Sequence, residues 1–228
     1  MKILSKITTK TPSGDLTWQG FDVRSLPTTN SFYKNISKVT DDGFGIEMNF
    51  EKQAIRHTVG ASTHAYLLYH ETNHSRNIVG FAFLKVLPGE DGSIVELSKV
   101  CIAKRAQKRG QSSILRNAII FDFDVSILTA KSQNTSVMHL IGKGDQVCFP
   151  FDKSYETSQG QKVLDILSRN TLFTNEDSQV FDMQSGVIQA RYGGRLGDHQ
   201  VSGITKYSSG LNRERGDAYL ITSLFKTN

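Results

Sequence analysis

The stretch between residues 94 and 123 constrains the fold more than any other, because its hydrophobic pattern changes twice over a short distance. Residues 94–103 alternate apolar side chains and are rich in β-branched residues, which predicts a strand. A basic loop follows at residues 104–111. Residues 112–121 then repeat apolar side chains with the period of a helix. The predicted buried face of this helix consists of Leu115, Ala118 and Ile119, widened by Ile114 and Phe121.

A strand, a basic loop with a glycine and a helix start form a suitable site for a phosphate group. The first turn of a helix exposes backbone N–H groups that have no partner within the helix, and the helix dipole adds positive charge there. Gly110 lets an anion approach the backbone, and Ser112 and Ser113 offer hydroxyl groups. Full charges come from Lys104, Arg105, Lys108 and Arg109. Neither the nucleotide-triphosphatase loop G-x-x-x-x-G-K-[ST] nor the dinucleotide fingerprint G-x-G-x-x-G is present here.

The run from Gln107 to Ser112 resembles the [QR]-x-x-G-x-[GA] pyrophosphate loop of the GCN5-related N-acetyltransferase (GNAT) superfamily. In that superfamily the loop lies between the fourth strand and the third helix and binds the pyrophosphate of acetyl-coenzyme A. The resemblance implies acetyl-CoA as cofactor, bound by Gln107, Lys108, Arg109, Gly110, Gln111, Ser112 and Ser113. It also implies that pantetheine contacts the strand backbone at Val100, Cys101 and Ile102. Ser112 departs from the pattern, because the superfamily has glycine or alanine there.

Two further matches extend the resemblance to roughly residues 62–151. Glu96 stands fourteen residues before Gly110, the position of the glutamate general base in histone-acetyltransferase-type members. After a predicted strand at residues 125–130, the segment that starts at Asn134 is similar to the N-x-x-A-x-x-L-Y segment, which implies a cofactor contact by Asn134. Ile141 replaces the tyrosine that serves many members as general acid, and His139 nearby is the candidate for that role.

The rest of the chain fits a mixed sheet. Residues 64–71 and 78–87 predict a hairpin, so that three antiparallel strands precede the strand–helix–strand segment. Further predictions are a helix at 31–39, a turn at 41–43, a strand at 46–50, an amphipathic helix at 158–170, a hairpin at 179–192 and a final strand at 218–225. The predicted fold class is α/β (α+β): a mixed, mostly antiparallel central sheet flanked by helices, as in GNAT-like acyltransferases.

Two regions follow from this reading. Residues 1–155 are the predicted GNAT-like acyltransferase domain. Residues 156–228 are a C-terminal extension packed on the same domain. Three roles are open for the extension: covering the acceptor cleft, extending the sheet or forming a homodimer contact.

Composition limits the remaining choices. The chain has 228 residues, a formal net charge of +5 and 38% hydrophobic residues, enough for a core. Its two cysteines provide no disulfide framework, and its six histidines lack metal-site spacing, so we expect reduced buried thiols and no metal. No apolar run approaches a membrane span and the first residues do not resemble a signal peptide, which favours a cytoplasmic location.

The leading functional hypothesis is an acyl-CoA-dependent N-acyltransferase that acetylates an amine on a protein, a small molecule or a nucleic acid. One alternative is a non-catalytic module with the same fold that binds nucleic acid through the basic loop. A second alternative is an acyl-homoserine-lactone-synthase-like enzyme, because Glu96-Leu97-Ser98-Lys99 is similar to the E-x-S-R stretch of those enzymes. The sequence does not decide the acceptor.

Overall fold

The structure is a computed structural model that describes residues 3–44, 52–132, 137, 140–142, 148–149, 151–189, 211, 215 and 217–225. The chain forms two compact units. The first comprises Met1–Val86 and Leu97–Asp124, and the second comprises Leu87–Glu96 and Val125–Asn228. Strands β4 and β5 contribute residues to both units.

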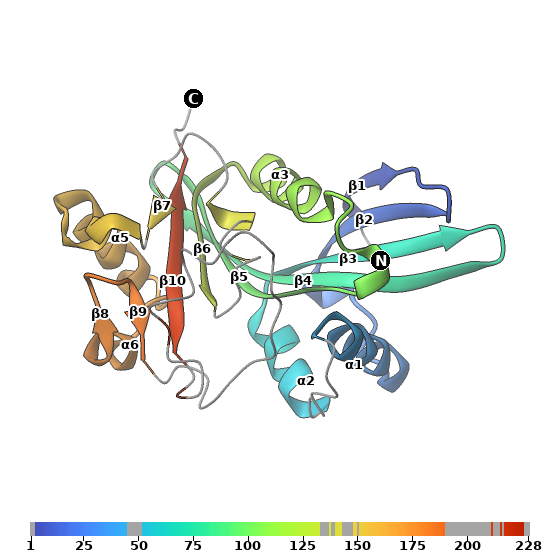
Figure 1. Ribbon diagram of the computed structural model, residues 1–228, viewed down its shortest axis with the longest axis horizontal. Coiled ribbons are helices and arrows are strands. Elements are labelled where there is room, and N and C mark those ends of the chain that lie inside the picture. Colours follow the sequence, from blue (N-terminus) through green and yellow to red (C-terminus); the bar gives the residue numbers. More distant parts are fainter. Residues whose placement is uncertain are drawn as a thin grey trace. The chain divides into compact units, whose positions relative to one another are not determined.

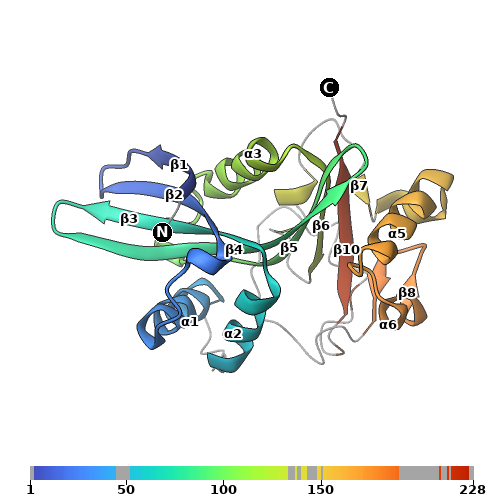
Figure 2. The same ribbon diagram turned by 180° about the vertical axis from the view of Figure 1, so that it is seen from behind.

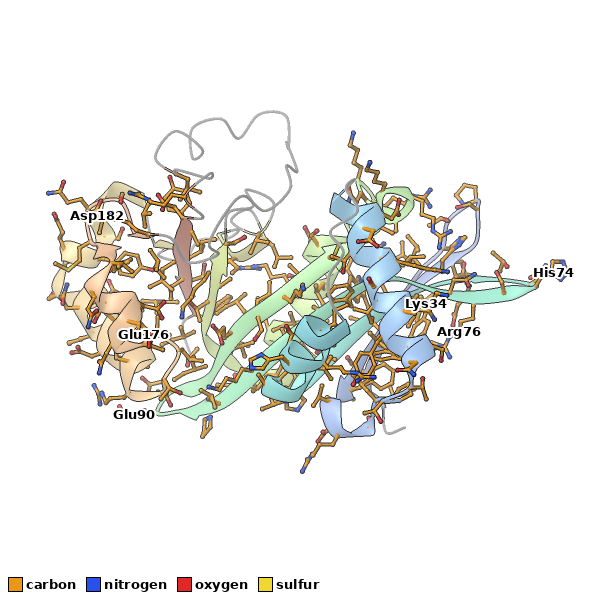
Figure 3. The ribbon with its side chains drawn as sticks, turned by 90° about the horizontal axis from the view of Figure 1, so that it is seen from below. Lys34, His74, Arg76, Glu90, Glu176 and Asp182 are labelled. Carbon is orange, nitrogen blue, oxygen red and sulfur yellow. The ribbon has the colours of Figure 1, made fainter. Side chains whose placement is uncertain are left out.

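The first unit is built on an antiparallel meander in which β1, β2, β3 and β4 pair in chain order (Figure 1). The bounds are β1 Ile3–Thr9, β2 Asp15–Asp22, β3 His64–Thr72, β4 Ser75–Gly89 and β5 Gly92–Ile102. A tight connection between Thr72 and Ser75, which face each other across the hairpin, joins β3 to β4, and Figure 3 shows His74 at its tip. The long apolar runs of β3 and β4 are buried on both faces, so helices must cover both sides of these strands.

Helices provide that cover in the first unit. The helices α1 (Asn30–Phe44) and α2 (Lys52–Ala61) lie on one face of the meander, and α3 (Gln111–Phe123) lies on the other (Figures 1 and 2). The buried stripe of α1 contains Phe32, Tyr33, Ile36 and Val39, which follow the helical period. The short 3₁₀ turns η1 (Val23–Ser25) and η2 (Lys104–Ala106) follow β2 and β5.

The second unit continues from the parallel pairing of β5 with β6 (Val125–Ser132). Strand β6 pairs antiparallel with β10 (Ala218–Leu224), which also pairs with β9 and β7. The remaining bounds are β7 Cys148–Phe149, η3 Phe151–Glu156, α5 Ser158–Arg169, α6 Asn175–Gln179, β8 Phe181–Asp182 and β9 Val187–Ile188. The core of this unit joins Ile94 and Ile127 to Tyr155, Leu167 and Leu220, so both sides of residue 155 share one hydrophobic cluster. The division at residue 155 stays a prediction.

The predicted fold class, a mixed and mostly antiparallel sheet flanked by helices, is confirmed. The strand–loop–helix–strand segment expected from the GNAT resemblance is present as β5, η2, α3 and β6. The C-terminal helix is also confirmed: the Thr157 hydroxyl caps it by accepting the N–H of Gly160 at 3.0 Å. The hairpin near residue 185 is present as β8 and β9.

Two local predictions are wrong. The predicted turn at residues 41–43 is the last part of α1, because Gly43 packs against β5 and a helix tolerates it there. Phe121 does not widen the buried face of α3, since 88% of it is exposed. Helix α6 was not predicted. The predicted strand at 46–50 lies outside the described residues.

Candidate functional site

The loop between β5 and α3 has the backbone geometry of an anion site. Gly110 is the N-cap of α3 and adopts a left-handed conformation with φ 70° and ψ 5°. A Cβ at this position would have no heavy atom within 4 Å, so the space over the glycine is open. Glycine adopts this conformation without the strain that other residues incur. Lys108, two residues earlier, also has a positive φ of 59°.

The first turn of α3 has two amide groups without a partner inside the helix. The N–H groups of Ser113 and Ile114 donate to the Gly110 carbonyl at 3.0 and 3.2 Å, which are the first bonds of the helix. The amides of Gln111 and Ser112 precede these bonds and have no carbonyl one turn earlier in the helix to receive them. Because α3 is a 13-residue helix, its dipole adds positive charge at this end.

Hydrogen bonds to β5 and α1 fix the path of the loop. The Gln107 side-chain amide donates from Nε2 to the Ile102 carbonyl at 2.7 Å and to the Gly43 carbonyl at 3.4 Å. The Lys104 backbone N–H donates to Asp42 Oδ2 at 3.0 Å. The loop motif alone does not reveal these partners, because Asp42 and Gly43 stand about sixty residues before the loop in the sequence.

A second anchor comes from the turn between β1 and β2. Arg109 donates from Nη1 to the hydroxyls of Thr11 and Ser13, both at 3.2 Å. The Gln111 side chain is buried, and its Nε2 lies 3.5 Å from the Arg109 carbonyl. Two of the predicted cofactor residues, Gln107 and Arg109, therefore support the loop, whereas Lys108 and Gly110 are exposed.

Strand β5 leads toward the predicted general base. Its parallel pairing with β6 runs from Ser93 to Glu96, and the last pair is Glu96 with Thr129. In the described part of the chain, β5 forms no further pair with β6 after Glu96, although β5 continues to Ile102. The β5 backbone on that side is therefore not used by β6 from Leu97 onward. Glu96 itself is half-buried and belongs to the second unit.

The side chains near the end of β5 are partly buried. Cys101 is a buried free cysteine whose Sγ donates to the Val39 carbonyl at 3.4 Å, and burial raises the pKa of its thiol to about 12. A thiol with this pKa stays protonated at neutral pH and is a poor nucleophile. Burial also lowers the pKa of Lys99 to about 8. Val100 and Ile102 are half-buried.

The structure places the remaining predicted site residues in different parts of the chain. The loop residues from Gln107 to Ser113 lie together at the start of α3. Asn134 and His139 lie outside the described residues. Arg105, predicted as one of the loop charges, lines a separate pocket beside α1. No pattern in the sequence pointed to that pocket, because its residues come from α1, β3, β4 and η2.

Comparisons with known proteins found similarity at the level of solved structures. No family model and no curated protein matches the chain. A structure of Arabidopsis thaliana NAA60 with a bisubstrate analogue is 13% identical, covers 92% of this chain and 99% of its own, and has a TM-score of 0.48. A GNAT-family acetyltransferase from Streptococcus pneumoniae is 11% identical with the same coverage and a TM-score of 0.45. Arabidopsis thaliana Naa50 with the bisubstrate analogue CoA-Ac-MVNAL is 11% identical, with a TM-score of 0.42.

Two further features are absent from the described residues. None of their helices combines the length and the apolar character needed to cross a membrane. No group of three or more histidine, cysteine, aspartate or glutamate side chains among them is arranged to hold a metal ion.

Proposed function

We propose that the protein is an acyl-CoA-dependent N-acyltransferase that transfers an acetyl group from acetyl-CoA to an amine. One observation carries the proposal. The loop between β5 and α3 ends in Gly110, which has a left-handed backbone conformation and is open to solvent, and the free amides of a long helix follow it. That geometry suits a diphosphate, and it coincides with the residues that resemble the GNAT pyrophosphate loop. The bisubstrate analogue CoA-Ac-MVNAL bound to Naa50 makes a peptide amine one candidate acceptor to test.

The residues that would hold the cofactor divide into two groups. The amides of Gly110, Gln111 and Ser112 would bind the diphosphate, with the Lys108 ammonium adding charge, whereas the Ser113 N–H already donates to the Gly110 carbonyl. Gln107 and Arg109 would act mainly by holding the loop in place, because their side chains already bond to neighbouring groups.

Pantetheine would lie along β5 after Glu96, where β6 no longer pairs with the strand. The backbone groups of Val100, Cys101 and Ile102 would be its hydrogen-bond partners. Asn134 would provide a further contact. When bound, acetyl-CoA supplies the thioester carbonyl carbon that the amine attacks.

The chemistry assigns roles to two side chains. Glu96 accepts a proton from the acceptor amine, directly or through one water, as the amine nitrogen forms its bond to the carbonyl carbon. The carbon–sulfur bond then breaks, and His139 donates a proton to the departing thiolate. General-base catalysis of this kind contributes about 10²–10⁴ in rate.

The first test is binding. Coenzyme A at about 100 times its Kd stabilises a protein by about 2.7 kcal/mol, which raises the melting temperature of a chain of this size by roughly 5–10 °C. We expect 3′-phosphoadenosine 5′-diphosphate, the portion of coenzyme A that contains the diphosphate, to compete with it. Gly110→Ala should weaken coenzyme A binding, because the new Cβ fills the open space over the loop. Absence of any shift with coenzyme A would refute the proposal.

The second test is turnover. Glu96→Gln should reduce acetyl transfer by about 10²–10⁴ at neutral pH without changing coenzyme A affinity. If Glu96→Gln turns over acetyl-CoA at the wild-type rate, the carboxylate has no part in the reaction.

A second candidate function is a nucleic-acid-binding module with this fold. It is favoured by the exposed basic side chains of Lys104, Arg105, Lys108 and Arg109 on one short segment. In that case coenzyme A has no effect on melting, whereas DNA or RNA binds with an affinity that decreases steeply with salt. The cytoplasmic location and the homodimer stay predictions.

A further inference from the structure

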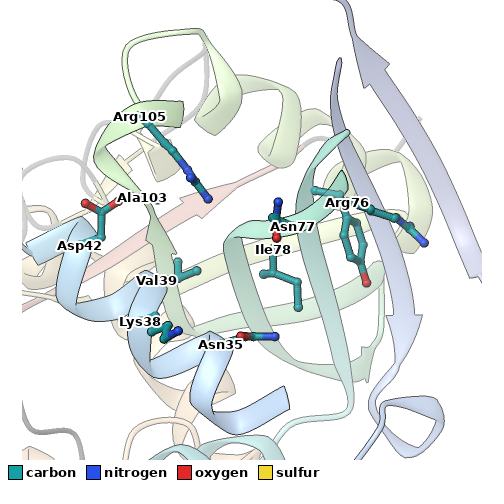
Figure 4. Close-up of a pocket in the computed structure, with 10 residues that line it drawn as sticks. Asn35, Lys38, Val39, Asp42, Arg76, Asn77, Ile78, Ala103 and Arg105 are labelled. Carbon is teal, nitrogen blue, oxygen red and sulfur yellow. The ribbon is translucent and has the colours of Figure 1, made fainter. Parts of the chain in front are cut away.

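The first unit contains a pocket of about 570 Å³ beside the proposed cofactor loop (Figure 4). Its walls come from α1, from β3 and β4 of the hairpin, and from the chain just after β5. The residues from Gln107 to Ser113 do not line it. A volume of this size lies within the range of about 300–1,000 Å³ that is typical of small-molecule sites.

The floor of the pocket is apolar. Val39 from α1, Ile78 from β4 and Ala103 after β5 lie along it, and Val39 and Ala103 are buried (Figure 4). Tyr69, also buried, contributes to the wall. A ligand that fills the pocket must therefore present an apolar ring or chain to these side chains.

Two cationic side chains on the rim form no ion pair within the described part of the chain. Arg105 and Lys38 are exposed, and neither side chain has a hydrogen bond or an ion pair with another described residue. Figure 4 shows Arg105 extending over the pocket. The other two charged residues of the rim are engaged. Arg76 bonds to Glu71 at 2.8 Å and lies over the Tyr69 ring, and Asp42 accepts the backbone N–H of Lys104.

Two side-chain amides complete the rim. Asn35 from α1 and Asn77 from β4 both line the pocket, and their side-chain amides have no hydrogen-bond partner among the described residues. Each offers two N–H donors and one carbonyl acceptor. The pocket thus combines an apolar floor with two unpaired positive charges, two side-chain amides and the Asp42 carboxylate, whose single negative charge offsets only part of the positive charge.

We propose that this pocket binds a small phosphate monoester with an apolar ring or chain. A phosphate monoester carries close to two negative charges near neutral pH and three strong acceptor oxygens. It matches a guanidinium, an ammonium and amide donors at once, whereas a carboxylate has one charge and two oxygens. The site is separate from the diphosphate loop, and the proposal goes beyond the proposed acetyl transfer.

Phenyl phosphate is the probe, because it combines a phosphate monoester with an apolar ring. We expect saturable binding in titration calorimetry. Inorganic phosphate lacks the ring, phenol lacks the charge and benzoate carries a carboxylate, so each should bind at least about tenfold more weakly. Equal binding of benzoate would overturn the assignment to a phosphate, and a lack of saturable binding by phenyl phosphate would overturn the site.

Variants locate the binding. Arg105→Gln and Lys38→Gln should each weaken phenyl phosphate binding by about tenfold. Lys34→Gln is the matched control, because Lys34 is an exposed lysine on the same helix that does not line the pocket (Figure 3). It should leave the affinity unchanged. An equal effect of all three variants would mean that only the general positive charge of the surface is involved, and would overturn the proposal.

Competition separates this inference from the proposed function. Saturating coenzyme A should leave phenyl phosphate binding unchanged, since the pocket and the diphosphate loop use different residues. Displacement of phenyl phosphate by coenzyme A would show that the pocket is part of the cofactor site, contrary to the proposal. If coenzyme A does not bind at all, the proposed function fails and the phenyl phosphate titration still tests the pocket.

Discussion

The contact between the end of α1 and the end of β5 gives a prediction that can be worked out from distances. Gly43 is the second-last residue of α1 and is buried. A Cβ at Gly43 would lie 2.3 Å from Cys101 Sγ and 3.0 Å from the Ile102 carbonyl oxygen. Both separations are shorter than van der Waals contact, so Gly43→Ala must displace α1, Cys101 or both.

Gly60 provides a matched control for the size of this effect. It is also the second-last residue of its helix, α2, but it is exposed and a Cβ there would meet nothing within 4 Å. Gly60→Ala should stabilise the protein by about 0.5 kcal/mol through helix propensity alone. Inserting an atom into a well-packed core costs about 1–3 kcal/mol. When the helix-propensity gain expected for Gly60→Ala is subtracted, Gly43→Ala should destabilise the protein by about 1–2 kcal/mol.

The assay is urea unfolding followed by the fluorescence of Trp18, the single tryptophan, which is buried in the first unit. Cys101→Ala removes the atom that Gly43→Ala would strike. In that background the cost of Gly43→Ala should therefore fall, although the close approach to the Ile102 carbonyl oxygen at 3.0 Å remains, and we expect a coupling energy of about 1 kcal/mol. Equal costs in both backgrounds, or a stabilisation like that of Gly60→Ala, would refute the reasoning.

Three other changes test separate features. Lys108→Gly should raise the free energy of unfolding in urea by about 1 kcal/mol, because glycine adopts the positive φ of this position without strain. The same change should weaken coenzyme A binding in calorimetry, and a gain in affinity would contradict this. Burial lowers the pKa of Lys99 from 10.5 to about 8, so between these pH values the unfolded chain binds more protons and stability rises with pH. Lys99→Met should thus be more stable than wild type at pH 7, with an advantage that shrinks from pH 8 to 10.5; a constant difference would contradict the assignment. Lys131→Met removes the cation that pairs with the buried Asp177 carboxylate and should lower the free energy of unfolding by about 3 kcal/mol in thermal unfolding. Arg24→Met breaks an exposed ion pair and should leave the free energy of unfolding unchanged.

Local patterns in the sequence predicted most of the fold. The strand, loop and helix around Gly110 could be predicted because their hydrophobic periods differ and because the loop between them contains a glycine. The capped helix after Thr157 was visible for the same reason. The turn predicted at residues 41–43 failed because Asp-Asp-Gly is a good turn sequence locally, while packing of Gly43 on β5 keeps the helix intact.

Features that depend on distant residues could not be predicted in this way. Phe121 fits the helical period of α3 and is nevertheless exposed, because the period does not show where the neighbouring elements stop covering the helix. Next to it in the sequence, Asp122 accepts hydrogen bonds from Ser5 and Tyr66, which come from β1 and β3. The pocket beside α1 is of the same kind: each of its residues is unremarkable in its own segment.

The cofactor loop illustrates why a motif is an incomplete description of a site. Its backbone geometry depends on Gly110, which the motif contains, but its position depends on two contacts with the end of α1, which are made by the Asp42 carboxylate and the Gly43 carbonyl. Displacing α1 should therefore disturb the loop without changing any motif residue. Coenzyme A affinity should fall in Gly43→Ala and remain unchanged in Gly60→Ala, and unchanged affinity in both would show that the loop holds its geometry independently of α1.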